Sequence, residues 1–469
     1  MKKYSFLKIL GITFLIVVAL SWIIPVGSYY DGTFTLGKTD PLGLLDLIRL
    51  PLSTFANFIH YGITILIIGG LYGVLIKTGA YDNLVEKIVE KFKGKEKTFL
   101  IITVLFFSIL TSLTGLVYLL LVLVPFFMAI LLLMNYNKLT TLMATVGAMF
   151  VGLIGCTYGF NINGIINYYF ALKNHDEIIT KFIFLALITF LLVVFVVKTS
   201  KRVDTEKEKI NIPLFKKDKK NQKSYWPLAI VMITTLIILL IGMYNWIYSF
   251  NVTFFSEMHN SLMDLKVADY PIVKNIIGSV NAMGYWNIYE LAVILIAAML
   301  LIGWIYSLKS KDLVDSFISG AKEILPTALY VTLANIIFTI IISGSNDQNM
   351  FYSIANYFFN LTEKLNVVTM SLVSSIGSFF YNDFSSYLEA MGTNIAIIYP
   401  DAEFYQIIGL ISRTMYGLVM FIAPTSLLLV GGLTYLNISY KEWLKYIWKY
   451  LIQVLVIALL VMVIMLIFI

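Results

Sequence analysis

The sequence is poor in the residues that most catalytic, metal-binding and disulfide-bonded proteins need. Its 469 residues include one cysteine, Cys156, and three histidines, His60, His175 and His259. A single cysteine excludes an internal disulfide. The histidines are scattered at the ends of apolar runs or in polar segments, without the spacing of a metal site, a nucleophile elbow or a phosphate loop. The sequence therefore predicts neither an enzyme nor a bound cofactor or metal.

Charge is also scarce, and apolar residues take its place. Charged residues make up 13% of the chain and hydrophobic residues 59%, with a mean hydropathy of +0.86. Apolar runs long enough to cross a bilayer recur along the chain. Only a structure that pairs its own backbone groups is stable in lipid. We therefore predict an all-α polytopic membrane protein, a multi-pass protein of the cell membrane, with roughly 10–12 spans that include two hairpin-like segments.

The net charge of +7 is concentrated next to apolar runs. Residues 198–223 hold ten basic and four acidic residues, and residues 87–97 hold five lysines. This is the positive-inside pattern of a membrane protein, so nucleic acid is not an expected partner. The same rule, applied to Lys2 and Lys3, predicts a cytoplasmic N-terminus.

The order of apolar runs and polar segments predicts five parts. They are a first transmembrane helix with an external loop (1–56), a first repeat (57–197), a basic cytoplasmic linker expected to be a solvated tether (198–226), two connecting spans with an external loop (227–324), and a second repeat (325–469).

Short matches and charge asymmetry together indicate that the two repeats are inverted. The matching positions are Gly79 with Gly344 and Asp82 with Asp347, both separated by 265 residues (344 − 79 = 347 − 82 = 265). An amphipathic helix predicted at 82–96 recurs at 346–364, but the second copy carries only Lys364 and belongs outside. Inverted repeats with interrupted helices are typical of secondary transporters.

Polar interruptions break the apolar runs of both repeats. Residues 98–134 form two apolar arms around 111–115, as either a re-entrant hairpin or a pair of crossings, and both return the chain to the same side. Residues 155–164 hold three glycines and two asparagines, which fits a discontinuous transport helix or an ordinary helix end. In the second repeat, the run at 404–434 is interrupted at Pro424.

The most polar of these stretches is 374–394, which begins inside an apolar run and is expected to break at Gly377. An ionisable side chain at the bilayer centre costs roughly 2.5–3.5 kcal/mol on insertion scales, so its two carboxylates imply a water-lined cavity, a cationic partner or a ligand. An ordinary external loop is the alternative. Its candidate substrate- or ion-binding residues are Asn382, Asp383, Ser385, Ser386, Glu389 and Asn394.

Arg413 lies inside the next apolar run and needs a partner there. It could bind a substrate carboxylate in bidentate fashion, or it could form a structural ion pair with Asp383 or Glu389. If Arg413 pairs with one carboxylate, the other is left for Na⁺, a proton or a substrate amine. A solute with both an amine and a carboxylate satisfies this set better than a plain dicarboxylate, which favours amino acids or peptides.

Four stretches resemble the anaerobic C4-dicarboxylate carrier family, particularly its YfcC-like branch. They are SWIIPVGSY at 21–29, GGLYGVLIKTGAYDNLVEKIVEKFKGKEK at 69–97, SGAKEILPTAL at 319–329 and IAPTSLLLVGGLTYLNISYKEWLKY at 422–446. The resemblance implies an ion-transporter-superfamily fold in which paired hairpins and broken helices enclose a substrate site. It also implies cation-coupled or exchange transport of small carboxylate-bearing solutes, and a homodimer.

The family's site positions carry over unevenly. Thr425 and Ser426 follow Pro424 in a direct match to the family's Pro-Thr-Ser break, while Asn161 and Asn163 echo an Asn-Pro-Phe-like element without its proline. The first hairpin, which usually bears acidic residues, offers only hydroxyls for hydrogen bonding, weak cation coordination or helix packing, and these belong to Thr111, Ser112 and Thr114. The usual short tip of the second hairpin is replaced by residues 382–392.

The sequence thus predicts a secondary active transporter that moves a small carboxylate-bearing solute by alternating access. The solute is an amino acid, a short peptide or a C4-dicarboxylate, and transport is coupled to Na⁺ or H⁺ or runs by exchange. Na⁺ is the candidate coupling ion, and no cofactor is expected. The alternatives are a basic amino acid antiporter of the arginine/ornithine type and a non-transporting membrane scaffold or sensor.

Overall fold

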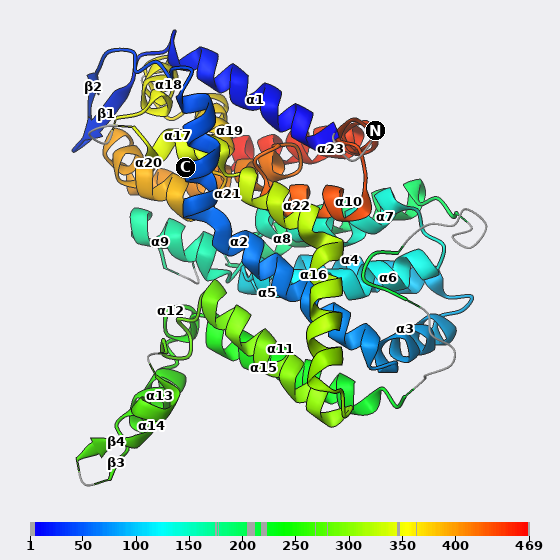
Figure 1. The fold of residues 1–469 in the computed structure, drawn as a ribbon. Helices are drawn as coiled ribbons and strands as arrows, with labels where there is room; N and C mark the ends of the chain where they lie inside the picture. The colour runs from blue at the N-terminus through cyan, green and yellow to red at the C-terminus, as the bar shows by residue number, and fades with distance from the viewer. Residues whose placement is uncertain are drawn as a thin grey trace.

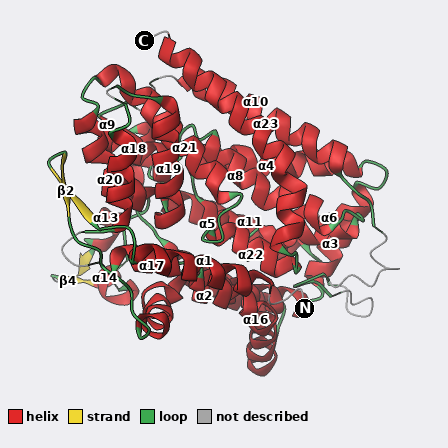
Figure 2. Ribbon diagram, turned by 90° about the horizontal axis from the view of Figure 1, so that it is seen from above, coloured by secondary structure: helices red, strands yellow, loops and turns green. Residues whose placement is uncertain are grey.

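A computed structural model describes residues 5–173, 176, 178–203, 212–216, 223–267, 269–278, 280–344, 348–362 and 364–467. The described residues are mostly helical, with two short antiparallel strand pairs at the edges (Figures 1 and 2). In the described part of the chain, seven helical segments are long and apolar enough to cross a membrane. They are α2 (Asp46–Lys77), α4 (Glu96–Thr114), α10 (Ile178–Thr199), α11 (Trp226–Met243), α15 (Ile288–Ile305), α16 with α17 (Ser310–Leu333 and Ile336–Ile342) and α23 (Tyr440–Ile467). The all-α polytopic membrane fold is confirmed.

Shorter helices fill the places where polar residues interrupt the apolar runs. In the first half they are α1 (Ser5–Ser21), α3 (Ala80–Lys91), α5 (Val117–Leu121), α6 (Val124–Leu133), α7 (Lys138–Leu142), η2 (Met143–Gly147), α8 (Ala148–Ile154), η3 (Phe160–Gly164) and α9 (Ile165–Phe170). In the second half they are α18 (Met350–Phe359), α19 (Val367–Tyr381), α20 (Phe384–Ile398), η4 (Ala402–Phe404), α21 (Tyr405–Met420) and α22 (Leu427–Leu436).

Two small strand pairs lie outside the helical body. Strands β1 (Gly27–Tyr30) and β2 (Thr33–Leu36) pair with each other and pack beside α18. The segment between α11 and α15 holds α12 (Trp246–Phe250), α13 (Phe254–Met263), β3 (Lys266–Val267), β4 (Tyr270–Pro271) and α14 (Ile272–Ile277). It projects away from the body as an arm, and none of the residues of α13 and α14 is buried (Figure 1).

The two halves meet most closely where α2 crosses α16. Gly73 and Gly320 lie at the crossing, where a Cβ atom on Gly320 would fall 2.8 Å from the Cα of Gly73. Small residues let two helix backbones approach this closely, and the gain is van der Waals contact along both helices. This crossing therefore joins the helix that precedes the first hairpin to the helix that precedes the second.

The elements of the two halves follow one another in parallel order. In each half the first hairpin arm packs against the first part of the broken helix, as α4 does with α8 and α19 does with α21. That part packs in turn against the last helix of its half, α8 against α10 and α21 against α23. The inverted orientation of the halves stays a prediction, and Asp347, one of its four matching positions, lies outside the described residues.

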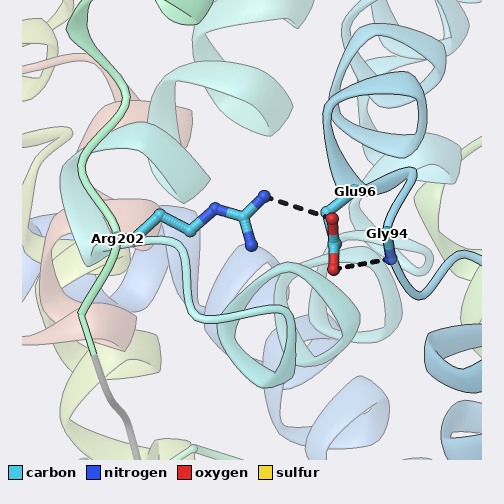
Figure 3. Close-up of polar contacts among 3 residues, drawn as sticks. All are labelled: Gly94, Glu96 and Arg202. Atoms are coloured by element: carbon cyan, nitrogen blue, oxygen red, sulfur yellow. Dashed lines mark hydrogen bonds and ion pairs between the residues drawn. The ribbon is translucent and has the colours of Figure 1, made fainter.

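The first hairpin ends on the side where it begins. Arg202, which follows α10, donates to Glu96 at the start of α4 with an N–O distance of 3.3 Å (Figure 3). The same short segment pairs with the end of α6, because the Val203 amide donates to the carbonyl of Asn135 at 2.8 Å. The two arms of the hairpin therefore return to one face, as both interpretations of residues 98–134 predict.

The basic linker differs from the solvated tether that its charge predicts. Between stretches outside the described residues, Pro213 and Leu214 pack against the helices, and the Leu214 side chain is only 1% exposed. The reason is local composition. Residues 212–215, Ile-Pro-Leu-Phe, are apolar within an otherwise charged segment, and burying them removes apolar surface from water.

Candidate functional site

All four interruptions of the apolar runs meet at one cavity of about 300 Å³. The first hairpin contributes its tip at Gly115, and the second contributes Asn382 and Asp383. The two broken helices contribute Asn161 and Ser426, which lie beside their breaks. Residues far apart in the sequence thus surround a single space, which is the arrangement in which a polar ligand can be held at membrane depth.

A glycine makes the tip of the first hairpin possible. Gly115 ends α4 with a φ of +68°, a left-handed conformation that side chains with a Cβ rarely adopt. A Cβ atom on Gly115 would also lie 3.3 Å from the Cα of Gly159, in the break of the first broken helix. The side chain of Asn161 donates to the Gly115 carbonyl at 3.5 Å. The tip and the break therefore fit together through close backbone approach and through the side chain of Asn161.

Of the three hydroxyl candidates in this hairpin, Ser112 is hydrogen-bonded to the same break. The carbonyl of Ser112 accepts from the amide of Thr157 at 3.0 Å, and the Ser112 hydroxyl donates to the Gly155 carbonyl at 2.6 Å. Thr111 is fully buried, and the Thr114 hydroxyl donates to the carbonyl of Leu110. None of these three candidates is among the residues that line the cavity. Ser112 holds the broken helix in place beside the cavity.

The second hairpin turns later than the glycine in its first arm predicts. Helix α19 runs straight through Gly377, so the predicted break there is wrong. Gly377 instead leaves room for the ring of Tyr387, which a Cβ atom would meet. The helix ends at Asn382, whose φ of +46° turns the chain, and two helices replace the external loop that was the alternative for this stretch.

Asp383 begins the second arm as its N-cap. Its carboxylate accepts from the Ser386 amide at 2.9 Å and from the Ser386 hydroxyl at 3.1 Å. Asp383 is solvent-exposed although its neighbours Asn382 and Phe384 are buried, because its exposed surface faces the cavity. Among the lining residues, all within the described part of the chain, Asp383 is the only one with a formal charge.

Three hydrogen bonds from other elements hold this tip. The Asn382 side chain donates to Oδ1 of Asn335 at 3.1 Å, at the junction of α16 and α17. The Tyr416 hydroxyl donates to the Asn382 carbonyl at 3.4 Å, and the Thr425 hydroxyl donates to the carbonyl of Phe379 at 3.1 Å. The candidate Thr425 therefore ties the second broken helix to the second hairpin.

Arg413 reaches the first broken helix from α21. The residue is 5% exposed, and its guanidinium donates to the Cys156 carbonyl at 3.1 Å and to Oδ1 of Asn163 at 3.0 Å. Asn163 donates in turn to the carbonyls of Cys156 and Thr157. These carbonyls follow the C-terminal end of α8, where the helix dipole is negative and a cation is favourable. Arg413 is not among the residues that line the cavity.

Six of the fourteen candidates line the cavity, and they are Asn161, Asn382, Asp383, Ser385, Ser386 and Ser426. Ser426 also caps α22. Of the remaining candidates, Glu389 lines two outer pockets, one together with Ser385 and the other together with Ser386. Asn394 accepts from the amide of Gly32 at 3.3 Å, next to the first strand pair.

Sequence reasoning missed four polar residues of the cavity wall. They are Tyr61, Tyr118, Asn335 and Tyr416. Asn335 carried a usable signal, since it is an amide inside the apolar run of 331–343. The tyrosines carried none, because aromatic residues are common throughout this chain. In the described residues, no cluster of three or more His, Cys, Asp or Glu side chains could hold a metal ion.

The chain matches a protein-family model and is similar to a solved structure. A family model described as the C4-dicarboxylate anaerobic carrier, DcuC, matches residues 5–467. The crystal structure of the Alcanivorax borkumensis YdaH transporter, described as revealing an unusual topology, aligns with 97% of this chain and 97% of its own, at 12% identity and a TM-score of 0.37. No curated protein sequence matches the chain.

Proposed function

Because the chain belongs to the C4-dicarboxylate anaerobic carrier family, we propose that it is a secondary active transporter for a small carboxylate-bearing solute. In this proposal the solute binds in the central cavity, and the cavity opens alternately to the two sides of the membrane. Two hairpin tips and two helix breaks at one space support this, because broken helices around a shared site are the usual construction of such carriers.

The charge of the cavity wall is the observation that decides the chemistry we propose. Asp383 is the only formally charged side chain among the described lining residues. A dicarboxylate entering alone would bring two more negative charges beside it, and like charges in a partly desolvated site repel strongly. A positive charge must therefore enter with the carboxylate, on the solute itself or as Na⁺ or H⁺ bound at Asp383.

Neutral polar groups are left to hold the solute carboxylate. The N-terminus of α20 is occupied by the carboxylate of Asp383, but α22 begins after Ser426, and the first amides of a helix have no partner within it. Such N-termini attract anions. Ser385, Ser386 and Asn161 add hydroxyl and amide groups on the same wall. A solute with an ammonium near Asp383 and a carboxylate at a helix N-terminus would satisfy both parts of the cavity.

We therefore place an amino acid or a short peptide ahead of a plain C4-dicarboxylate. The same observation favours a second candidate, a basic amino acid exchanged against another. Its net charge of +1 would neutralise Asp383 without a coupling ion. A C4-dicarboxylate, the substrate in the family's description, would need at least one accompanying cation.

Counterflow in proteoliposomes tests the proposal. Proteoliposomes that contain the purified protein are loaded with unlabelled arginine, ornithine, glutamate, a dipeptide or succinate. Entry of the same labelled solute is then followed with and without Na⁺. Accumulation with an amino acid or dipeptide supports the proposed chemistry, and accumulation without Na⁺ for arginine or ornithine supports the exchange candidate. Accumulation with succinate alone would refute the preference for a zwitterion. No flux from folded protein with any of these solutes would favour a non-transporting role.

A further inference from the structure

We propose that residues 212–216, the linker plug, close the route between the central cavity and the face of the protein that carries the basic linker. The plug must leave its place for solute to pass on that side. This inference rests on the carrier function proposed above. It adds a moving closure supplied by a segment that belongs to neither repeat.

A second, apolar cavity of about 70 Å³ continues from the central one toward the plug. Tyr61, Tyr118 and Leu427 line both cavities. The lining of the second cavity then extends to Leu214 and Tyr435. A polar solute cannot cross a narrow apolar space without losing its hydration, so the second cavity together with Leu214 forms a closed gate.

The plug is held by contacts from three helices. The Leu214 amide donates to Oε1 of Glu323 on α16 at 3.0 Å, and the Tyr435 hydroxyl of α22 donates to the Pro213 carbonyl at 2.9 Å. The ring of Phe215 packs edge-on against Tyr81 of α3, with ring centroids 6.2 Å apart. Helix α3 belongs to the first half and α16 and α22 to the second, so the plug spans the junction between them.

The backbone of the plug has the conformation of a segment held by its surroundings. Leu214 has a φ of +51°, which residues with a branched side chain rarely adopt. Nothing in its own sequence favours that turn, so the contacts with Glu323, Tyr435 and Tyr81 must maintain it. Once those contacts are lost, Leu214 can adopt a more favourable φ, and no interaction within the segment keeps it in its docked position. A closure of this kind opens as a unit.

Charge assigns the plug to the cytoplasmic side. Residues 198–223 carry ten basic and four acidic residues, and the positive-inside rule keeps such segments in the cytoplasm. In this proposal the plug therefore closes the route from the central cavity to the cytoplasm.

Thiol labelling measures the gate without requiring transport. In a Cys156→Ser background, Thr327→Cys places a single thiol on the wall of the apolar cavity, where residue 327 is 7% exposed. Leu214→Ala should raise the rate at which a membrane-impermeant maleimide labels this thiol from the cytoplasmic side by more than about tenfold, because the buried side chain that seals the cavity is lost. Lys216→Ala, at an exposed position of the same segment, should leave the rate unchanged. Equal rates in all three proteins would overturn the inference.

Cross-linking tests whether the plug must move. Leu214→Cys and Glu323→Cys are introduced together in the Cys156→Ser background, because these two positions are neighbours in the structure. A cleavable bifunctional thiol reagent then joins the two cysteines. Counterflow should stop when the link forms and return when a reductant cleaves it. Undiminished counterflow in fully linked protein would refute the requirement. If the wild-type protein transports none of the solutes, the proposed function fails, and the labelling rates alone decide whether the plug is a gate.

Discussion

At the scale of single residues, Arg413 and Asp383 occupy different places in the structure, although the sequence makes both of them candidate binding residues. Arg413 stabilises the break of the opposite half of the chain through Cys156 and Asn163, and Asp383 supplies the charge of the cavity wall. The buried Arg413 side chain bonds one main-chain carbonyl and one side-chain amide oxygen, so it supports the structure beside the cavity without lining the cavity.

Replacing Arg413 should therefore reduce stability. Arg413→Ala leaves buried acceptors on Cys156 and Asn163 without this donor, which costs about 1–3 kcal/mol or more for a charged group. The measurement is the midpoint of thermal unfolding in detergent. Arg49→Ala, at an exposed position, is the control. A midpoint for Arg413→Ala equal to that of the control would show that these contacts contribute nothing.

Asp383 should be required for transport but not for folding. In Asp383→Asn the amide oxygen can still accept from the Ser386 amide, since asparagine is as good an N-cap as aspartate, while the negative charge is lost. We expect folded protein with counterflow abolished for every solute that enters with a cation. Asp315→Asn, which removes an exposed carboxylate, should behave as wild type. Normal flux in Asp383→Asn would remove this carboxylate from the site.

At the scale of elements, the crossing of α2 and α16 depends on glycine. Gly320→Val would force the backbones apart at Gly73, and overpacking of a close contact costs typically 1–3 kcal/mol. The expected result is a lower unfolding midpoint and a smaller yield of monodisperse protein. Gly11→Val is the matched control, because a Cβ atom there meets nothing within 4 Å. Equal yields and midpoints for the two variants would show that the crossing tolerates a side chain.

Sequence patterns predicted the elements better than their contacts. Apolar runs gave the long helices, and Gly155 and Pro424 lie in the breaks they indicated. Gly377 was misread because a glycine inside a helix and a glycine that ends one look alike until the neighbouring ring of Tyr387 is known. The partners of Arg413 and the docking of Leu214 depend on residues more than a hundred positions away, so no local pattern could predict them.

At the scale of the whole molecule, the positive-inside rule predicts the orientation of the fold in the membrane. A thiol introduced at Lys93, in the basic turn after α3, should react with an impermeant reagent from the cytoplasmic side alone. A thiol at Asn260, an exposed position of the projecting arm, should react from the external side alone. Intact cells and inside-out vesicles give the two measurements. Labelling of both positions from the same side would contradict the predicted topology.

If the chain is the carrier proposed above, the carboxylate of Asp383 has a consequence for the driving force of the transport cycle. An empty cavity carries the charge of Asp383, whereas a cavity filled by one cation, or by a solute with a net charge of +1, is neutral. A unit charge that crosses the whole field changes in energy by about 2.3 kcal/mol per 100 mV. Membrane voltage should therefore act on the return of the empty carrier and leave one-for-one exchange nearly unaffected. The voltage dependence of transport would then be set by the return of the empty carrier.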